Sequence, residues 1–226
     1  MRFFLALLFL MMTKMAIAGP LEAASAAYAK GDFVVARKLY SELAFQGDTF
    51  AQFKLGEIYD EGKGLPQDAR EAIRWYCVAS VQGISEAAYN LGRLYHDGRG
   101  TAQNYRRAKE WYLVATKRGE MKAAVNLGVM NTLGEGGRRD YRKAIEWFLM
   151  AAQHSDARGA SNLGELYFNG QGVRRDLVRS HMWYNLAAAQ GDSEAVKNRK
   201  LVERFMTTNQ ILKAQQMASE KQMYLP

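Results

Sequence analysis

Residues 83–118 read GISEAAYNLGRLYHDGRGTAQNYRRAKEWYLVATKR, and the stretches on both sides repeat this pattern with a period of 36 residues. The preceding copy, residues 47–82, reads GDTFAQFKLGEIYDEGKGLPQDAREAIRWYCVASVQ, and residues 119–154 and 155–190 continue the frame without an insertion. A fixed period of this length is typical of a solenoid of helix pairs, because a single unit cannot bury its apolar face alone. The sequence therefore predicts an all-α repeat fold whose function lies on a surface built by several units.

Each repeat is predicted to contain two helices, because its apolar residues recur at helical spacing. The first helix carries the i, i+4, i+7, i+8 pattern of one buried face, and the second carries a tryptophan followed by another aromatic residue in all four copies. A pair of glycines separates the helices, as in Gly62 and Gly64, and suits the left-handed conformation that ends a helix. A polar residue that can cap the second helix follows in every copy: Asp68, Asn104, Asp140 and Asp176.

A glycine also falls in the middle of each first helix, where it costs about 1 kcal/mol relative to alanine. The same cost in four copies indicates a steric requirement. We expect these glycines to admit a bulky tryptophan or tyrosine from the second helix, which for Gly128 is Trp147 or its neighbour. The four positions are Gly56, Gly92, Gly128 and Gly164.

The combination A-x-x-N-L-G-x-L-Y-x-x-G-x-G, followed by K-A-x-x-W-Y-x-x-A-A-x-x-G, resembles the Sel-one-like (Sel1-like) repeat, a short relative of the tetratricopeptide repeat. The resemblance covers four full copies at residues 47–190. Residues 19–46 resemble a degenerate N-terminal repeat unit, and residues 191–226 resemble the C-terminal capping helices of such an array. The resemblance implies a right-handed α-solenoid of about six helix hairpins, in which the first helices line the concave face.

The first 18 residues have the composition of a signal peptide. Arg2 precedes an apolar run at 3–12 that is too short to span a bilayer, and Ala16 and Ala18 are small residues of the kind that a signal peptidase recognises. Removing Arg2 and Lys14 leaves 29 basic against 23 acidic residues in the chain that begins at Gly19, a net charge of +6. We therefore expect a periplasmic or secreted protein with no transmembrane segment after signal removal.

Motifs that carry enzyme chemistry are mostly missing. His96, His154 and His181 occupy unrelated repeat positions without metal-site spacing, so we expect no metal and no cofactor. A cysteine-rich branch of the resembled family has been linked to penicillin binding and β-lactamase activity, but no serine here has the S-x-x-K spacing and the sequence has one cysteine, Cys77. We interpret Cys77 as a small apolar packing residue, with a reactive or intermolecular thiol as the alternative.

An asparagine stands at the same place in three successive first helices, and a lysine takes this place in the repeat before them. The resemblance directs these side chains toward the concave face, where regularly spaced amides can hydrogen-bond the backbone of an extended peptide. The alternative is that the amides bond to neighbouring helices and set the stacking of the repeats. The set, named here the asparagine ladder, consists of Lys54, Asn90, Asn126 and Asn162.

Two pairs of arginines occupy matching positions just before second helices, and more basic residues follow at the helix starts. Repetition in register predicts a ridge suited to an anionic partner such as an acidic protein, lipopolysaccharide or peptidoglycan, with a solvated charged edge as the alternative. Nucleic acid is not expected, because the net charge of the exported chain is moderate and no nucleic-acid-binding fold is recognised. The arginine ridge consists of Arg138, Arg139, Arg174 and Arg175.

The sequence thus predicts an exported, non-catalytic scaffold or adaptor that binds a protein or an extended peptide on its concave face. Two alternatives remain open: a cell-wall-directed enzyme of the penicillin-binding or β-lactamase kind, and a secreted factor that binds host proteins. Turnover of a β-lactam or a muropeptide would favour the enzyme, and appearance outside the cell would favour the host factor.

Overall fold

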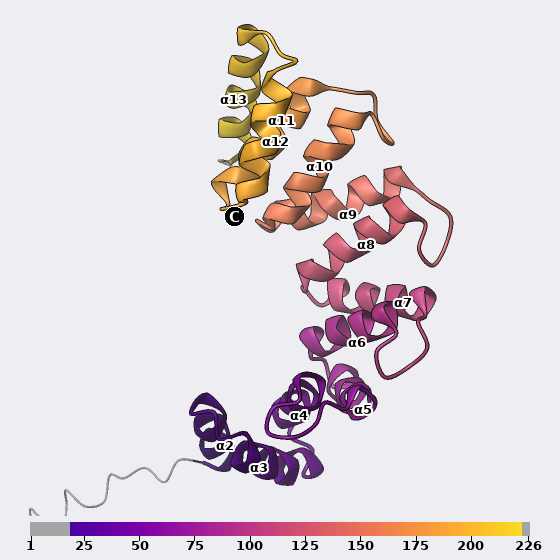
Figure 1. Ribbon diagram of the computed structural model, residues 1–226, viewed down its shortest axis with the longest axis vertical. Helices are drawn as coiled ribbons and strands as arrows, with labels where there is room; N and C mark the ends of the chain where they lie inside the picture. Colours follow the sequence, from indigo (N-terminus) through magenta and orange to yellow (C-terminus); the bar gives the residue numbers. More distant parts are fainter. Residues whose placement is uncertain (1–18, 223–226) are drawn as a thin grey trace, which may run out of the picture. The chain divides into compact units, whose positions relative to one another are not determined.

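The computed structural model describes residues 19–222, so the predicted signal peptide lies outside the described residues. Every regular element in this range is an α-helix, and the helices are numbered α2 to α13 (Figure 1). They belong to two compact units, named here the N-terminal unit, which ends at Gln82, and the C-terminal unit, which begins at Gly83. In the described range, no helix is both long enough and apolar enough to cross a bilayer.

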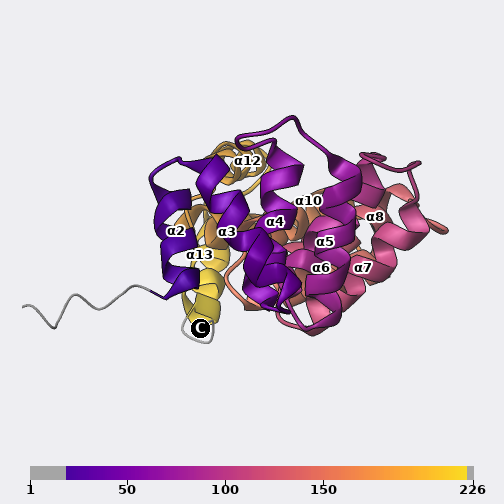
Figure 2. The ribbon, with the colours of Figure 1, turned by 90° about the horizontal axis from the view of Figure 1, so that it is seen from below.

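In the N-terminal unit each helix packs against the next one along the chain, and Figure 2 shows these helices from below. Tyr40, Leu55 and Ile58 are fully buried between them, and the Tyr40 hydroxyl lies 3.1 Å from Ser25 Oγ. The core of this unit is therefore shared by successive helices, as a repeat fold requires. The helices are α2 (Pro20–Ala29), α3 (Phe33–Phe45), α4 (Thr49–Glu61) and α5 (Ala69–Val81).

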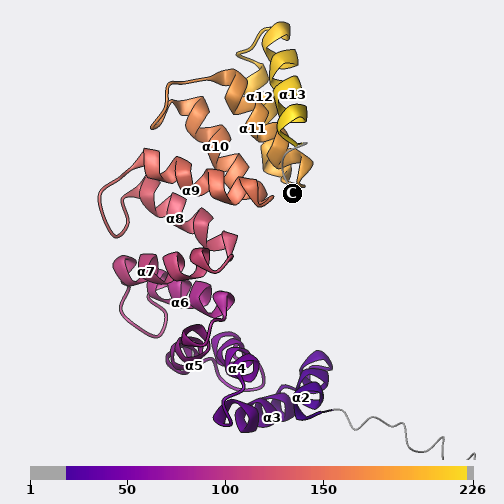
Figure 3. The ribbon, with the colours of Figure 1, turned by 180° about the vertical axis from the view of Figure 1, so that it is seen from behind.

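In the C-terminal unit three helix hairpins, α6–α7, α8–α9 and α10–α11, stack through contacts of α7 with α8 and of α9 with α10 (Figure 3). The last two helices differ, because α12 and α13 each pack on α11. The helices are α6 (Ser85–Asp97), α7 (Tyr105–Lys117), α8 (Met121–Leu133), α9 (Tyr141–Gln153), α10 (Ala157–Asn169), α11 (Leu177–Ala189), α12 (Ser193–Glu203) and α13 (Thr208–Gln222).

The helix bounds follow the 36-residue frame of the sequence. The first helices α4, α6, α8 and α10 begin at Thr49, Ser85, Met121 and Ala157, and each has 13 residues. The second helices α5, α7, α9 and α11 also have 13 residues each. The chain is an all-α helical repeat solenoid, and the predicted repeat is confirmed.

The predicted ends of the helices are confirmed as well. Gly62, Gly98, Gly134 and Gly170 end the first helices in the left-handed conformation, with φ between 68° and 81°. The carboxylate or amide oxygens of the predicted caps accept backbone N–H groups in the first turn of the second helices; the caps are Asp68, Asn104, Asp140 and Asp176.

The glycines in the middle of the first helices have the expected steric reason. A Cβ added to Gly92 would lie 2.5 Å from Cδ1 of Tyr112, and one added to Gly128 would collide with the Phe148 ring. The ring that requires the glycine is therefore the aromatic residue after the tryptophan, so for Gly128 it is the neighbour of Trp147 and not Trp147 itself.

Candidate functional site

Lys54, the first member of the asparagine ladder, contacts nearby acidic and aromatic residues of the N-terminal unit. Its ammonium forms an ion pair with Glu57 at 2.7 Å. The same Nζ lies 5.2 to 5.5 Å from the ring centroids of Tyr28, Phe50 and Phe53. A cation that already has a carboxylate and three aromatic faces is fixed in place, so Lys54 differs chemically from the asparagines that follow it.

In the C-terminal unit the ladder asparagines line two small hollows at equivalent repeat positions. The hollow at Asn126 has a volume of about 270 Å³ and the hollow at Asn162 a volume of about 220 Å³. Each is walled by the aromatic ring that packs on a mid-helix glycine, Tyr112 in the first and Phe148 in the second. The repeat therefore places the same kind of concavity next to the same amide in two successive units.

The two asparagines nevertheless make different hydrogen bonds. Asn126 bonds to the hydroxyl of Tyr112, whose pKa is raised because the hydroxyl is buried. Phe148 has no hydroxyl to offer, and Asn162 donates from Nδ2 to the backbone carbonyl of Arg158 at 2.7 Å. Asn126 thus has the structural role that the sequence left open as an alternative, whereas the Asn162 amide keeps an oxygen and an N–H for another group. Asn90, on α6, is half-buried.

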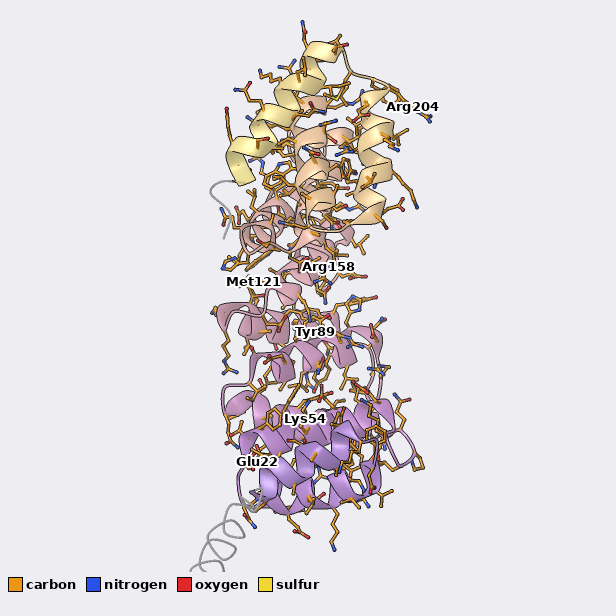
Figure 4. The ribbon with its side chains drawn as sticks, turned by 90° about the vertical axis from the view of Figure 1, so that its left-hand side faces the viewer. Glu22, Lys54, Tyr89, Met121, Arg158 and Arg204 are labelled. Atoms are coloured by element: carbon orange, nitrogen blue, oxygen red, sulfur yellow. The ribbon has the colours of Figure 1, made fainter. Side chains whose placement is uncertain are left out.

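Arg158 of the first helix α10 lies near Tyr89 of the first helix α6. Asp156 holds the Arg158 guanidinium with two bonds, Nη2 to Oδ2 at 2.7 Å and Nε to Oδ1 at 3.0 Å. The hydrogen bond to Asp156 raises the pKa of Arg158, and the Tyr89 hydroxyl on α6, which lies near this guanidinium, contributes a smaller increase. Figure 4 shows Tyr89 and Arg158 one above the other on the face turned to the viewer. The face of the first helices that carries Tyr89, Asn126, Arg158 and Asn162 is named here the first-helix surface.

His96 connects two successive repeats at the edge of this surface. Its Nδ1 lies 3.0 Å from Asp97, and its Nε2 lies 3.0 Å from Glu135 in the α8–α9 loop. Burial lowers the pKa of His96, but the hydrogen bonds to the two carboxylates outweigh burial, so the pKa is raised above 6.5. The imidazolium is thus favoured in the folded state, where it can donate to both carboxylates at once.

This pKa shift predicts a pH dependence of stability. A raised folded-state pKa contributes stability that is complete below pH 6.5, the ordinary value, and is lost as pH rises through the folded-state pKa. We expect His96→Gln and Glu135→Gln to flatten the change in unfolding free energy between acidic and alkaline pH, measured by urea unfolding. His154→Gln is the control, because His154 is exposed and its ring, among the described residues, bonds to the Met150 carbonyl of the adjoining helix α9. Identical pH profiles for His96→Gln and the wild type would contradict the prediction.

The four residues of the arginine ridge make different contacts. All four arginines are exposed, in the α8–α9 and α10–α11 loops. Arg139 lines the hollow at Asn162, so the ridge and the ladder meet there. Arg175 donates from Nε to the Phe168 carbonyl at 3.0 Å, in the loop position where Gln103 bonds to the carbonyl of His96. One ridge arginine therefore also braces its own loop.

Sequence reasoning missed three features of this region. Asn198 follows Asn162 by 36 residues and extends the ladder into α12, which the repeat frame could have revealed. Tyr89 and Glu135 act through partners in other repeats, and their own spacing gives no signal.

Cys77 is a half-buried free thiol on α5. Within the described residues, no three His, Cys, Asp or Glu side chains are grouped so that they could hold a metal ion.

Comparison with known proteins identifies the repeat. Four segments that together make up more than half of the chain match the model of the Sel1 repeat: residues 49–83, 85–120, 122–156 and 157–192. No curated protein matches the chain.

The crystal structures that are similar to the chain include the following two. A Sel1 repeat protein from Oxalobacter formigenes is 28% identical, with a TM-score of 0.73 over 95% of this chain and 93% of that one. The protein c5321, a protective antigen present in uropathogenic Escherichia coli strains that displays an SLR fold, is 27% identical, with a TM-score of 0.55. That alignment covers 92% of this chain and 53% of the antigen, so the chain spans about half of the antigen's length.

Proposed function

The chain belongs to the Sel1 repeat family, whose members are generally scaffolds for protein interactions, and from this we propose that it is an exported, non-catalytic scaffold that binds an extended segment of a protein partner on its first-helix surface. This is the surface that the family resemblance expects to be concave. The observation that carries the proposal is the recurrence of one hollow beside one amide, at Asn126 and at Asn162.

The size and chemistry of the hollows favour a peptide over a small molecule. Both volumes lie below the roughly 300–1,000 Å³ that is usual for small-molecule sites, so each hollow suits a single side chain of a longer segment. The Asn162 amide offers a donor and an acceptor to a peptide backbone that passes between the hollows. Arg139 and Glu165 in the same hollow give it both signs of charge, which suits a polar side chain.

Asn162 provides the sharpest test, because its side chain supports no other side chain among the described hydrogen bonds. We expect Asn162→Ala to weaken capture of a partner from an envelope extract by about three- to tenfold, the value of one hydrogen bond, with an unchanged melting temperature. Asn169→Ala, at an exposed position of the same helix, is the matched control and keeps full capture. A folded Asn162→Ala variant with wild-type capture would exclude the Asn162 hollow as part of the binding surface.

Asn126→Ala is a poorer probe of binding. The change leaves the buried Tyr112 hydroxyl without its amide partner, which costs about 1–3 kcal/mol. Loss of capture by this variant would therefore report partly on folding, and its melting curve has to be measured beside its binding.

Export is proposed from the composition of residues 1–18. We expect the mature protein to begin at Gly19, and we expect Ala18→Arg to leave a membrane-associated precursor, because the peptidase accepts only small residues there. Mass spectrometry of the N-terminus after cell fractionation measures both outcomes. A cytosolic wild-type protein that retains Met1 would contradict export.

A further inference from the structure

A groove runs between α11 and α13 in the C-terminal unit. It consists of two hollows of about 730 and 460 Å³ that share Tyr167 and Arg179 as lining residues. Figures 1 and 3 show α13 beside α11, and α13 contributes Gln210 to the first hollow and Met217 to the second. None of the lining residues belongs to the hollows at Asn126 and Asn162, so this groove is separate from them.

The first hollow is basic. Arg174, Arg175 and Arg179 line it, with Asp176 as the acidic residue among them. Arg179 lies over the Tyr167 ring at 5.6 Å and 3.5 Å from Asp176, which fixes its guanidinium. Within residues 19–222 neither Arg174 nor Arg175 takes part in an ion pair. Arg175 donates from Nε to the Phe168 carbonyl, so the Arg174 guanidinium and the Nη groups of Arg175 remain for anions. A planar guanidinium suits a carboxylate with two parallel hydrogen bonds.

The second hollow is largely apolar. Leu149, Met182, Trp183 and Met217 line it, together with Tyr167, Arg179, Glu220 and Lys221. The Lys221 ammonium lies 4.8 Å from the centroid of the Trp183 ring. Methionine side chains adapt their shape to different apolar groups, which makes this hollow a receptor for one bulky aliphatic or aromatic side chain.

We infer that the α11–α13 groove binds a peptide in which acidic residues stand beside a bulky apolar residue. The carboxylates of such a peptide face Arg174 and Arg175, and its apolar side chain enters the hollow of Trp183 and Met217. A polyanion such as polyphosphate would use the arginines alone and gain nothing from the apolar hollow. The adjoining pair of hollows therefore favours the amphipathic peptide.

The probe is a fluorescein-labelled peptide, Asp-Glu-Asp-Gly-Phe-Leu, titrated with the mature protein and followed by fluorescence polarisation. We expect Arg174→Gln to weaken its binding by about three- to tenfold. Arg138→Gln is the matched control: it lies one repeat earlier, is exposed and lies outside the groove, and it is expected to bind like the wild type. Met217→Ser is expected to weaken binding of the probe as well. Melting curves are recorded for every variant.

Two altered peptides separate the contributions of the hollows. Replacing the acids by amides, or Phe-Leu by Ser-Ser, is expected to weaken binding to the wild type, and added salt is expected to weaken the acidic peptide more than the amide one. The inference fails if the probe does not bind, if Arg138→Gln and Arg174→Gln lose equal affinity, or if polyphosphate or the Ser-Ser peptide binds as tightly as the probe. Asn162→Ala is expected to bind the probe peptide like the wild type. A failure of the groove proposal is therefore distinguishable from a failure of the proposal that the first-helix surface binds a partner.

Discussion

Gly128→Val is expected to lower the free energy of unfolding by about 1–3 kcal/mol through overpacking. A side chain at this position meets the fully buried Phe148 ring of α9, with the added Cβ in collision with Cε1 of that ring. Helix propensity predicts the opposite sign, because valine is a better helix former than glycine. Urea unfolding followed by far-ultraviolet circular dichroism therefore decides between the two effects from the direction of the shift alone.

Two further variants test the cause of this loss. Gly137→Val is the control, since a Cβ at Gly137 meets no atom within 4 Å, and we expect a change within about 0.5 kcal/mol. Combining Gly128→Val with Phe148→Ala should cost less than the sum of the two single changes, because the smaller side chain makes room for valine. Additive losses in this cycle would show that the Phe148 ring is not the obstacle.

The repeat frame, the caps and the glycine ends were predictable because each depends on local spacing. A 36-residue period fixes the helix starts, and a polar side chain before a helix has one obvious task, as Asp140 shows with the Lys143 amide at 3.0 Å. The identity of the ring above Gly128 was not predictable in the same way. Adjacent residues such as Trp147 and Phe148 point in different directions from a helix, and a spacing pattern does not tell which one faces the partner.

The candidate sites were only partly predictable, because positions that are equivalent in the sequence differ in their partners. Asn126 and Asn162 share a register, yet Tyr112 offers a hydroxyl to the first and Phe148 offers none to the second. The sequence does show this difference, because Tyr112 and Phe148 stand 14 positions before Asn126 and Asn162. The α11–α13 groove could not be predicted from the 36-residue repeat, because α13 has no counterpart in the repeats.

A signal for α13 was present in the second helices. At one shared position of these helices, Val78 is 43% exposed and Met150 is 36% exposed, whereas Leu186 on α11 is 2% exposed. Four residues earlier, Glu146 is exposed on α9, but Met182 takes this position on α11 and is buried. A face that becomes more apolar in the last repeat indicates that another helix covers it.

Ala214→Glu is therefore expected to separate α13 from α11. Ala214 and Ala218 are buried on one face of α13, one turn apart, so a carboxylate at Ala214 would have to enter the contact with α11. The penalty for burying an unpaired charge is several kcal/mol, and it is avoided only if the helix leaves. Undocking exposes Leu186 and Trp183, each worth about 1.5–3 kcal/mol when buried. Melting temperature and limited proteolysis of α13 measure the effect.

Gln215→Glu adds the same charge at the neighbouring, exposed position of α13 and is expected to leave both measurements unchanged. The pair of variants also connects the stability of α13 with the groove, because Gln210 and Met217 depart with the helix. Ala214→Glu should consequently lose the acidic probe peptide while Gln215→Glu retains it. A protein that melts early and yet binds the peptide normally would mean that α13 protects α11 without taking part in recognition, and the groove would then be reduced to its arginine end.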